Sequence, residues 1–132
     1  AFALPSREFD SRTVQKFMTN KKPYYLIGIA GVAMASLAGL LKKKGHKIAG
    51  ADQEMYEPMK SMLEKLKIKV FSPYSAFHMK HWKPDVVVIG NAIDRGNPEL
   101  EYALSIGHIY RSMSDILQND LEAYKYVFAR FT

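Results

Sequence analysis

The strongest structural signal in this chain is the run Tyr24-Tyr25-Leu26-Ile27-Gly28-Ile29-Ala30-Gly31-Val32-Ala33-Met34. Its first half is typical of a buried strand, its small residues indicate a tight turn, and a helix is expected to begin near Val32. Backbone N–H groups at such a junction can approach a phosphate closely, and the positive end of the helix favours an anion. The run therefore predicts a site for a nucleotide or another diphosphate ligand.

Strands and helices alternate along the rest of the chain. The expected strands are Tyr24–Ile29, Lys47–Ala51, Lys69–Phe71, Asp85–Ile89, Ile109–Tyr110 and Tyr126–Phe131. The expected helices are Val32–Lys44, Pro58–Lys67, Pro98–Ile106 and Ser112–Ala123, whereas Ser72–Lys83 is expected to be a loop with at most a short helical turn. This alternation predicts an α/β fold: a doubly wound, mainly parallel five-stranded Rossmann-like sheet with helices on both faces.

The length of 132 residues suits one domain with a substantial core. We expect residues 1–22 to be an N-terminal extension with a short helix near Ser11–Met18, and residues 23–124 to form the domain. Residues 125–132 are expected to start a strand or linker that leads into a further domain.

Composition narrows the classes of function. The chain has no cysteine, which excludes a disulfide framework and thiol catalysis. No apolar run approaches the ~20 residues that a membrane span needs, and the start lacks the features of a signal peptide, so we expect a cytoplasmic location and no membrane partner. The net charge is +6, but the run Lys42-Lys43-Lys44 falls where a helix should end and complements its dipole. A nucleic-acid partner is therefore not expected.

The first candidate site is the turn after the first strand, formed by Gly28, Ala30, Gly31, Val32, Ala33 and Met34. It is a near miss to G-x-G-x-x-G, because alanines replace the second and third glycines. Asp52 follows the second strand, where an acid can accept hydrogen bonds from ribose hydroxyls in a dinucleotide fold. A plain tight turn and a solvated acid are the alternatives.

The second candidate site is the loop after the most apolar strand, and its candidate residues are Asn91, Ala92, Ile93, Arg95 and Asn97. The Arg95 guanidinium could bind phosphate or carboxylate, and the asparagines offer amide donors and acceptors. Asn97-Pro98-Glu99 also suits simple helix capping. We expect no metal site from the four histidines, no catalytic residue in this chain, and no ATP phosphate loop, since G-x-x-x-x-G-K-[ST] is absent.

These residues leave three functions open. One is a domain that binds a sugar nucleotide. The second is an NAD-binding domain of a dehydrogenase, which the same Gly28 and Asp52 would suit. The third is a regulatory nucleotide-sensing domain, or a scaffold without a ligand.

Four segments together resemble the N-terminal domain of the Mur ligases: Gly28-Ile-Ala-Gly31-Val-Ala-Met34, Gly45-His46-Lys-Ile-Ala-Gly50-Ala-Asp52, Pro84-Asp85-Val-Val-Val-Ile-Gly90-Asn91-Ala92-Ile, and Asn97-Pro98-Glu99. The resemblance spans residues 24–120. Two subfamilies are similar, the UDP-N-acetylmuramate–L-alanine ligases and the murein-peptide recycling ligases. Two further features resemble the recycling ligases: Tyr56-Glu57-Pro58-Met59 with Leu63-Glu64, and Gly90-Asn91-Ala92 with Arg95-Gly96-Asn97-Pro98.

The resemblance implies that this domain binds the UDP part of UDP-N-acetylmuramate. It implies that ATP and Mg²⁺ belong to a separate central domain of the parent enzyme, so no cofactor is expected in this chain. The parent would form an amide bond between the muramyl carboxylate and L-alanine or an L-alanyl peptide. The chain alone is expected to have no ligase activity.

Overall fold

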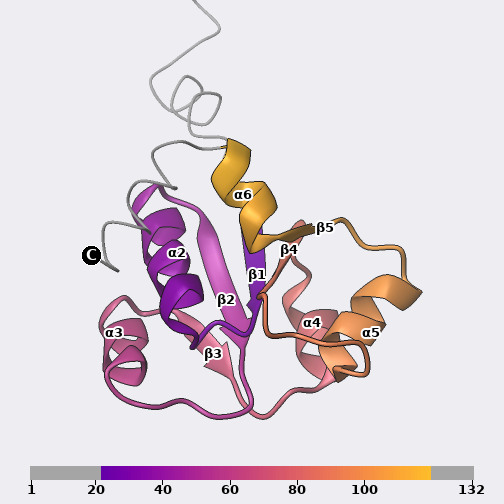
Figure 1. Cartoon of the computed structure of the whole chain (residues 1–132), viewed down its shortest axis with the longest axis horizontal. Helices are drawn as coiled ribbons and strands as arrows, with labels where there is room; N and C mark the ends of the chain where they lie inside the picture. The colour runs from indigo at the N-terminus through magenta and orange to yellow at the C-terminus, as the bar shows by residue number, and fades with distance from the viewer. Residues whose placement is uncertain (1–21, 120–132) are drawn as a thin grey trace, which may run out of the picture.

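The computed structural model describes residues 22–119, and Figure 1 shows their arrangement. Five strands form one sheet in the order β3-β2-β1-β4-β5, and every neighbouring pair is parallel. The strands are β1 (Pro23–Ile27), β2 (Lys47–Ala51), β3 (Lys69–Phe71), β4 (Val86–Ile89) and β5 (Tyr110–Ser112). From β1 the chain adds β2 and β3 on one side of the sheet and then β4 and β5 on the other. The strand order therefore reverses between β1 and β4, and the carboxyl ends of these two strands mark the switch point of a doubly wound fold.

The centre of the sheet is buried on both sides. Tyr25, Leu26 and Ile27 of β1 are fully buried, as are Val87 and Val88 of β4. Such continuous apolar strands are typical of parallel sheets that are covered on both faces. Strand β2 approaches β1 so closely that a Cβ atom on Gly50 would lie 2.4 Å from the carbonyl oxygen of Leu26, so only glycine fits there.

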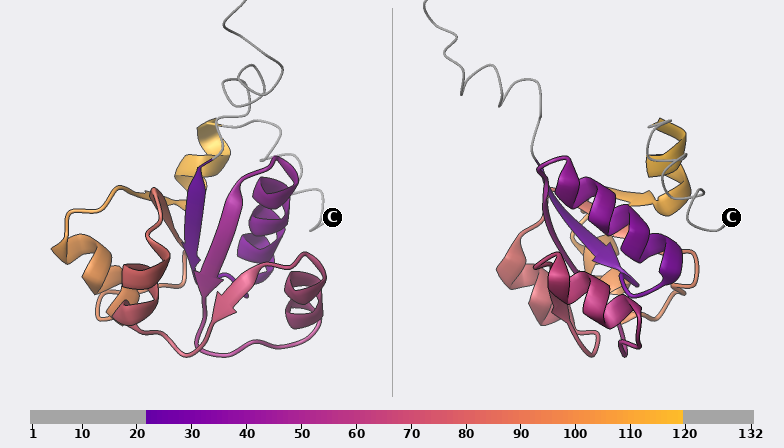
Figure 2. Two further views of the ribbon diagram at one scale, coloured as in Figure 1. Left: turned by 180° about the vertical axis from the view of Figure 1, so that it is seen from behind. Right: turned by 90° about the vertical axis from the view of Figure 1, so that its left-hand side faces the viewer.

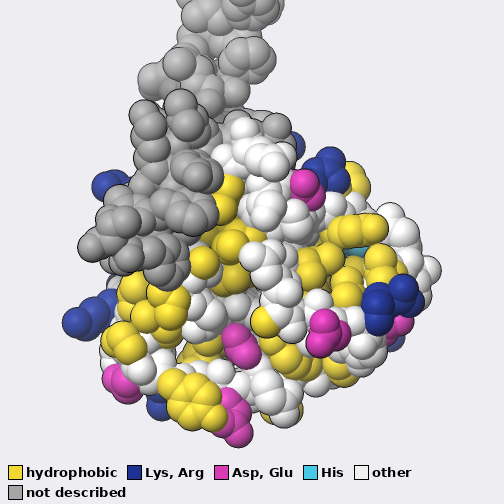
Figure 3. Space-filling model, viewed as in Figure 1, with side chains coloured by type: hydrophobic (Ala, Val, Ile, Leu, Met, Phe, Trp, Pro, Cys, Tyr) yellow, Lys and Arg dark blue, Asp and Glu magenta, His cyan; other side chains and the backbone are white. Residues whose placement is uncertain are grey.

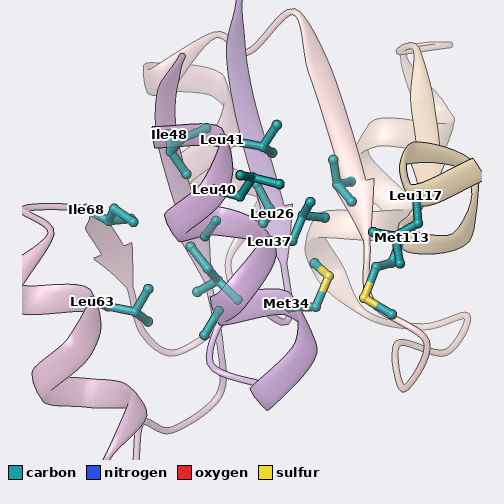
Figure 4. Packing of buried hydrophobic residues seen from close by; sticks show 14 residues of the cluster. Leu26, Met34, Leu37, Leu40, Leu41, Ile48, Leu63, Ile68, Met113 and Leu117 are labelled. Carbon is teal, nitrogen blue, oxygen red and sulfur yellow. The ribbon is translucent and has the colours of Figure 1, made fainter. Parts of the chain in front are cut away.

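Helices cover both faces of the sheet, as the two views in Figure 2 show. On one face lie α2 (Val32–Lys43), α3 (Met59–Lys65) and α6 (Met113–Asn119), and on the other lie α4 (Ala76–Trp82) and α5 (Pro98–Ser105). Each face has its own hydrophobic cluster. The first joins Leu26 to Leu37, Leu63 and Met113, and its packing is shown in Figure 4. The second joins Tyr25 and Ile27 to Met79 and Leu100.

The fold class and the order of the strands along the chain are as predicted. The sheet was expected to be mainly parallel, and all its neighbouring strand pairs are parallel. The main error is helix α4, which fills much of the predicted loop Ser72–Lys83. Ser75 caps it by accepting a hydrogen bond from the Phe77 N–H, and Met79 is buried against the sheet. Pro73 near the start of this stretch and Pro84 just after it obscured the helix, although Ser75 was a visible N-cap signal.

The boundaries of several elements also shift. Strand β1 begins and ends earlier than predicted, because Gly28 already starts the turn. Helix α3 is shorter than Pro58–Lys67, with Pro58 as its N-cap residue. Strand β5 continues to Ser112, whose hydroxyl and N–H exchange hydrogen bonds with Asp115 at the start of α6. The predicted helix at Ser11–Met18, the end of the helix predicted to reach Ala123 and the strand at Tyr126–Phe131 lie outside the described residues.

Within residues 22–119, no helix is long and apolar enough to cross a membrane.

Candidate functional site

A cavity of about 750 Å³ lies at the carboxyl edge of the sheet. Eleven of the twelve predicted site residues line it: Gly28, Ala30, Gly31, Val32, Ala33, Met34, Asp52, Asn91, Ala92, Ile93 and Asn97. They come from the ends of β1, β2 and β4, which meet here because the strands are parallel. The cavity has the position expected for a ligand in a doubly wound fold, and its size is within the range of small-molecule sites.

The β1–α2 turn is held in place by the neighbouring strand. Gly28 has φ +89°, a conformation that favours glycine, and its N–H donates to the Ala51 carbonyl oxygen at 2.8 Å. The N–H of Ile29 donates to the same oxygen at 3.1 Å, and the N–H of Gly31 donates to the Gly28 oxygen at 3.2 Å. The turn is therefore fixed by backbone contacts, which leaves the helix that follows it free to face the cavity.

Helix α2 begins without a cap. Its N-cap residue is Gly31, no side chain accepts a hydrogen bond from its first turn, and that turn has no acidic residue. Among the described residues, the backbone N–H groups of Val32, Ala33 and Met34 have no hydrogen-bond partner, whereas the N–H of Ala35 already donates to Gly31 at 2.7 Å. Three donors and the positive end of a 12-residue helix therefore open onto the cavity, which is the usual arrangement for binding an anion.

Asp52 lies beside the N-terminus of α2 and is hydrogen-bonded to the β1–α2 turn. Its Oδ2 accepts the N–H of Ala30 at 2.9 Å, and its Oδ1 accepts the N–H of Gln53 at 2.8 Å. The hydroxyl of Tyr74 lies 3.4 Å from Oδ1. Burial raises the pKa of Tyr74, and the negative charge of Asp52 raises it further, so this phenol stays protonated and can donate a hydrogen bond. Each carboxylate oxygen keeps acceptor capacity toward the cavity.

The β4–α5 loop forms another wall and ends in a fully capped helix. Asn97 Oδ1 accepts the N–H groups of Glu99 at 3.0 Å and Leu100 at 3.2 Å, and Pro98 occupies the first helical position. The capping interpretation of Asn97 is thus confirmed. Ile93 packs against the β1–α2 turn, since its Cδ1 lies 3.2 Å from the position of a Cβ on Gly28.

Arg95 is the one predicted site residue that does not line the cavity. Its Nε donates to Glu101 Oε2 at 2.7 Å, and a terminal nitrogen donates to Oε1 at 3.1 Å. The pair lies on the surface, with 76% of the Arg95 side chain exposed. The Arg95 guanidinium, followed by the N–H of Gly96, lowers the pKa of Glu101 to about 2. The geometry thus gives Arg95 a local partner in place of a phosphate.

Eight further residues line the cavity: Glu54, Tyr56, Glu57, Pro58, Met59, Tyr74, Gly90 and Met113. Gly90 and Met113 directly follow β4 and β5, at the carboxyl edge where a doubly wound sheet binds its ligand. The same rule applied to the end of β3 would have found Tyr74. The segment 54–59 follows Asp52 around the rim, and only the resemblance of Tyr56-Glu57-Pro58-Met59 to a family motif pointed to it.

No Lys, Arg or His lines the cavity, as far as the described residues show. In the view of Figure 3, the visible Lys and Arg side chains lie near the outline of the molecule, whereas several hydrophobic and acidic side chains lie nearer its middle. The net charge of +6 therefore does not concentrate at the site. Residues 22–119 also contain no group of three His, Asp or Glu side chains that could hold a metal ion.

The parallel sheet, its winding and the cavity at its switch point define a domain of the doubly wound α/β class. Residues 23–125 match the family described as "Mur ligase family, catalytic domain", and the chain belongs to this Mur ligase family.

Relatives in two subfamilies are similar to this chain. The UDP-N-acetylmuramate–L-alanyl-γ-D-glutamyl-meso-2,6-diaminoheptandioate ligase of Escherichia coli K12 is 40% identical over 88 residues, which cover 67% of this chain and 19% of the relative. The UDP-N-acetylmuramate–L-alanine ligase of Lactobacillus acidophilus is 36% identical over 101 residues, which cover 76% of this chain and 23% of the relative.

A solved structure of the first type of ligase, from Neisseria meningitides, superposes with a TM-score of 0.72 at 37% identity. The match covers 76% of this chain and 31% of that protein. The matched part of the chain thus spans 19% to 31% of the length of these relatives.

Proposed function

We propose that this chain is the domain of a peptidoglycan ligase that binds UDP-N-acetylmuramate. The observation that carries the proposal is the uncapped N-terminus of α2, whose three unpartnered N–H donors open onto a 750 Å³ cavity. The printed names of the relatives give UDP-N-acetylmuramate as their substrate, which supports this ligand class. Membership of the Mur ligase family does not favour the NAD-binding alternative.

The diphosphate would bind at the first turn of α2, close to Val32, Ala33 and Met34. Asp52 would accept hydrogen bonds from the ribose hydroxyls, and the loop that carries Asn91 and Asn97 would lie along the nucleoside. Since no Lys or Arg among the described residues lines the cavity, backbone donors would supply most of the favourable charge for the phosphates. Arg95 is left out of this proposed site because it is paired with Glu101.

The whole parent protein would join the muramyl carboxylate to the amine of L-alanine or of an L-alanyl peptide. ATP would supply the phosphoryl group that activates the carboxylate, with Mg²⁺ balancing the phosphate charge. The residues of this chain do not fit ATP, because it has no lysine-bearing phosphate loop. Its own task would be to hold the sugar nucleotide so that the muramyl carboxylate projects away from the sheet edge.

Calorimetric titration of the 132-residue chain tests the binding proposal. UDP-N-acetylmuramate and UDP should both bind, and NAD should not. Tight binding of NAD with no binding of UDP-N-acetylmuramate would contradict the proposal. In the full-length parent, product formation with L-alanine and with L-alanyl-γ-D-glutamyl-meso-diaminopimelate would identify the amine substrate, while the chain alone should form no product with either.

A further inference from the structure

Glu99 is an unusual acid for the first turn of a helix, because it is fully buried. Such residues normally point to solvent, where they complement the helix dipole. Here the carboxylate is buried, and it accepts a hydrogen bond from Tyr25, a member of the second hydrophobic cluster. Burial raises the pKa of Glu99, although hydrogen bonds from Tyr25, Ser75 and His78 act in the opposite direction.

Three groups from separate parts of the chain converge on this carboxylate. The hydroxyl of Tyr25 in β1 donates to Oε1. The backbone N–H of Ser75, in the β3–α4 loop, donates to Oε2 at 3.2 Å. The ring nitrogen Nδ1 of His78 in α4 lies 3.4 Å from the same oxygen. Among the described residues, no buried side-chain nitrogen or oxygen lacks a hydrogen-bond partner, so both carboxylate oxygens of Glu99 are satisfied by these contacts.

The network joins two walls of the cavity. Tyr74, which is adjacent to Ser75, lines the cavity and contacts Asp52. Asn97, which caps α5 through the Glu99 N–H, lines it from the other loop. Glu99 itself does not line the cavity. One buried carboxylate therefore fixes the loop of Tyr74 to the helix that begins at Asn97.

We propose that Glu99 is the positioning residue of this cavity: its side chain holds the loop of Tyr74 against α5, and its loss weakens ligand binding without removing any ligand contact. This inference rests on the nucleotide-sugar function proposed above. What matters is an acceptor that reaches the Ser75 N–H, so the length of the side chain should matter more than its charge.

Four variants of the 132-residue chain separate this role from general stability. Glu99→Gln keeps the length and an acceptor oxygen, Glu99→Asp keeps the charge but is one methylene shorter, and Glu99→Ala removes both. Glu101→Gln is the matched control, because Glu101 is an exposed acid on the same helix outside the cavity lining. Circular dichroism should show that each variant is folded at the temperature of the titration.

The measured quantity is the Kd for UDP-N-acetylmuramate. We expect Glu99→Gln to stay within about threefold of the parent chain. Glu99→Asp and Glu99→Ala should weaken binding by about fivefold or more, since each leaves the partly buried N–H of Ser75 without its acceptor. Glu101→Gln should have no effect. If Glu99→Ala does not fold, the order of the Gln and Asp variants still decides: equal affinities, or a weaker Gln variant, would overturn the proposal.

Amide chemical shifts give a readout that does not need the ligand. Glu99→Asp should move the ¹H–¹⁵N signals of Tyr74 and Ser75, and Glu101→Gln should leave both in place. If the parent chain does not bind UDP-N-acetylmuramate but these signals move, the proposed function fails while the link between the loops stands. Unchanged signals in Glu99→Asp would refute the positioning role even if the parent chain binds the ligand.

Discussion

Helices α2 and α5 both begin at the cavity, but their first turns are built differently. Helix α5 has Asn97 as a side-chain cap, a proline at its first position and two acids, Glu99 and Glu101, in its first turn. Helix α2 has a glycine at the N-cap, no side-chain cap and no acid. The first-turn N–H groups of α5 are thus hydrogen-bonded to a side chain of this chain. Those of α2 remain available to a ligand. Under the proposed function, the open end of α2 would bind the anion and the capped end of α5 would support the cavity wall.

Adding a negative charge to the open turn of α2 should have the largest effect. Ala33→Glu places a carboxylate beside the proposed diphosphate, and two like charges ~4 Å apart repel by ~4 kcal/mol at an effective dielectric constant of 20. Even half of this energy weakens UDP-N-acetylmuramate binding more than about tenfold in a calorimetric titration. Ala33→Gly, the control, should bind nearly as the parent chain does. Unchanged binding by folded Ala33→Glu would place the diphosphate elsewhere.

Giving α2 a cap like that of α5 should have the next largest effect. Gly31 has φ −64°, which any residue can adopt, and a Cβ atom there meets only the Gly28 oxygen at 3.5 Å. In Gly31→Asp, the new carboxylate should accept hydrogen bonds from the free N–H groups of the first turn and raise the free energy of unfolding by about 0.5 kcal/mol. The same carboxylate should weaken ligand binding by about tenfold. Urea unfolding and calorimetry measure the two effects. Gly31→Ser, without the charge, should bind better than Gly31→Asp, and an equal loss in both would point to a steric cause.

Removing the cap of α5 should mainly lower stability. Asn97→Ala leaves the N–H groups of Glu99 and Leu100 without their acceptor, which lowers the free energy of unfolding by about 1 kcal/mol. The melting temperature measured by circular dichroism should fall by a few degrees. Asn97→Asp keeps an acceptor oxygen and should melt close to the parent chain. A parent-like melting temperature for Asn97→Ala would contradict the structural role of this cap.

The smallest effect concerns Glu101 and Glu99, the two acids in the first turn of α5. Their contributions to the free energy of unfolding change with pH in opposite directions. The Arg95 contact lowers the pKa of Glu101 to about 2, so its contribution to stability is present above the ordinary value of 4.5 and is lost as the pH falls toward 2. Arg95→Gln should move this pKa, followed by carboxyl ¹³C NMR, back toward 4.5. A pKa that stays near 2 would show that Arg95 is not its cause.

The pKa of Glu99 is raised, so its protonated form favours folding below 4.5. This contribution is lost as the pH rises from 4.5 through the raised pKa. Glu99→Gln has no such titration. Its free energy of unfolding in urea should therefore improve relative to that of the parent chain as the pH increases through this range.

The local patterns of the sequence were sufficient for most of the fold. The apolar run Val86–Ile89 and the strand-turn-helix order at Gly28 predicted the sheet and the edge at which the cavity lies, because parallel strands bring their carboxyl ends together. Tertiary contacts determined what was missed. Arg95 forms an ion pair with Glu101, six residues away. The side chain of Glu99 is buried, where Tyr25, Ser75 and His78 contact its carboxylate. No periodicity in the chain encodes these contacts.

The cavity is lined by residues from both hydrophobic clusters, which lie on opposite faces of the sheet. Met34 and Met113 reach it from the cluster of α2, α3 and α6, and Ile93 reaches it from the cluster of α4 and α5. A bound ligand would therefore contact both layers and favour states in which both are folded. At a ligand concentration of 100 times Kd, this linkage adds about 2.7 kcal/mol. Hydrogen exchange would then slow together in the two layers, so that a bound ligand would couple them into one cooperative folding unit.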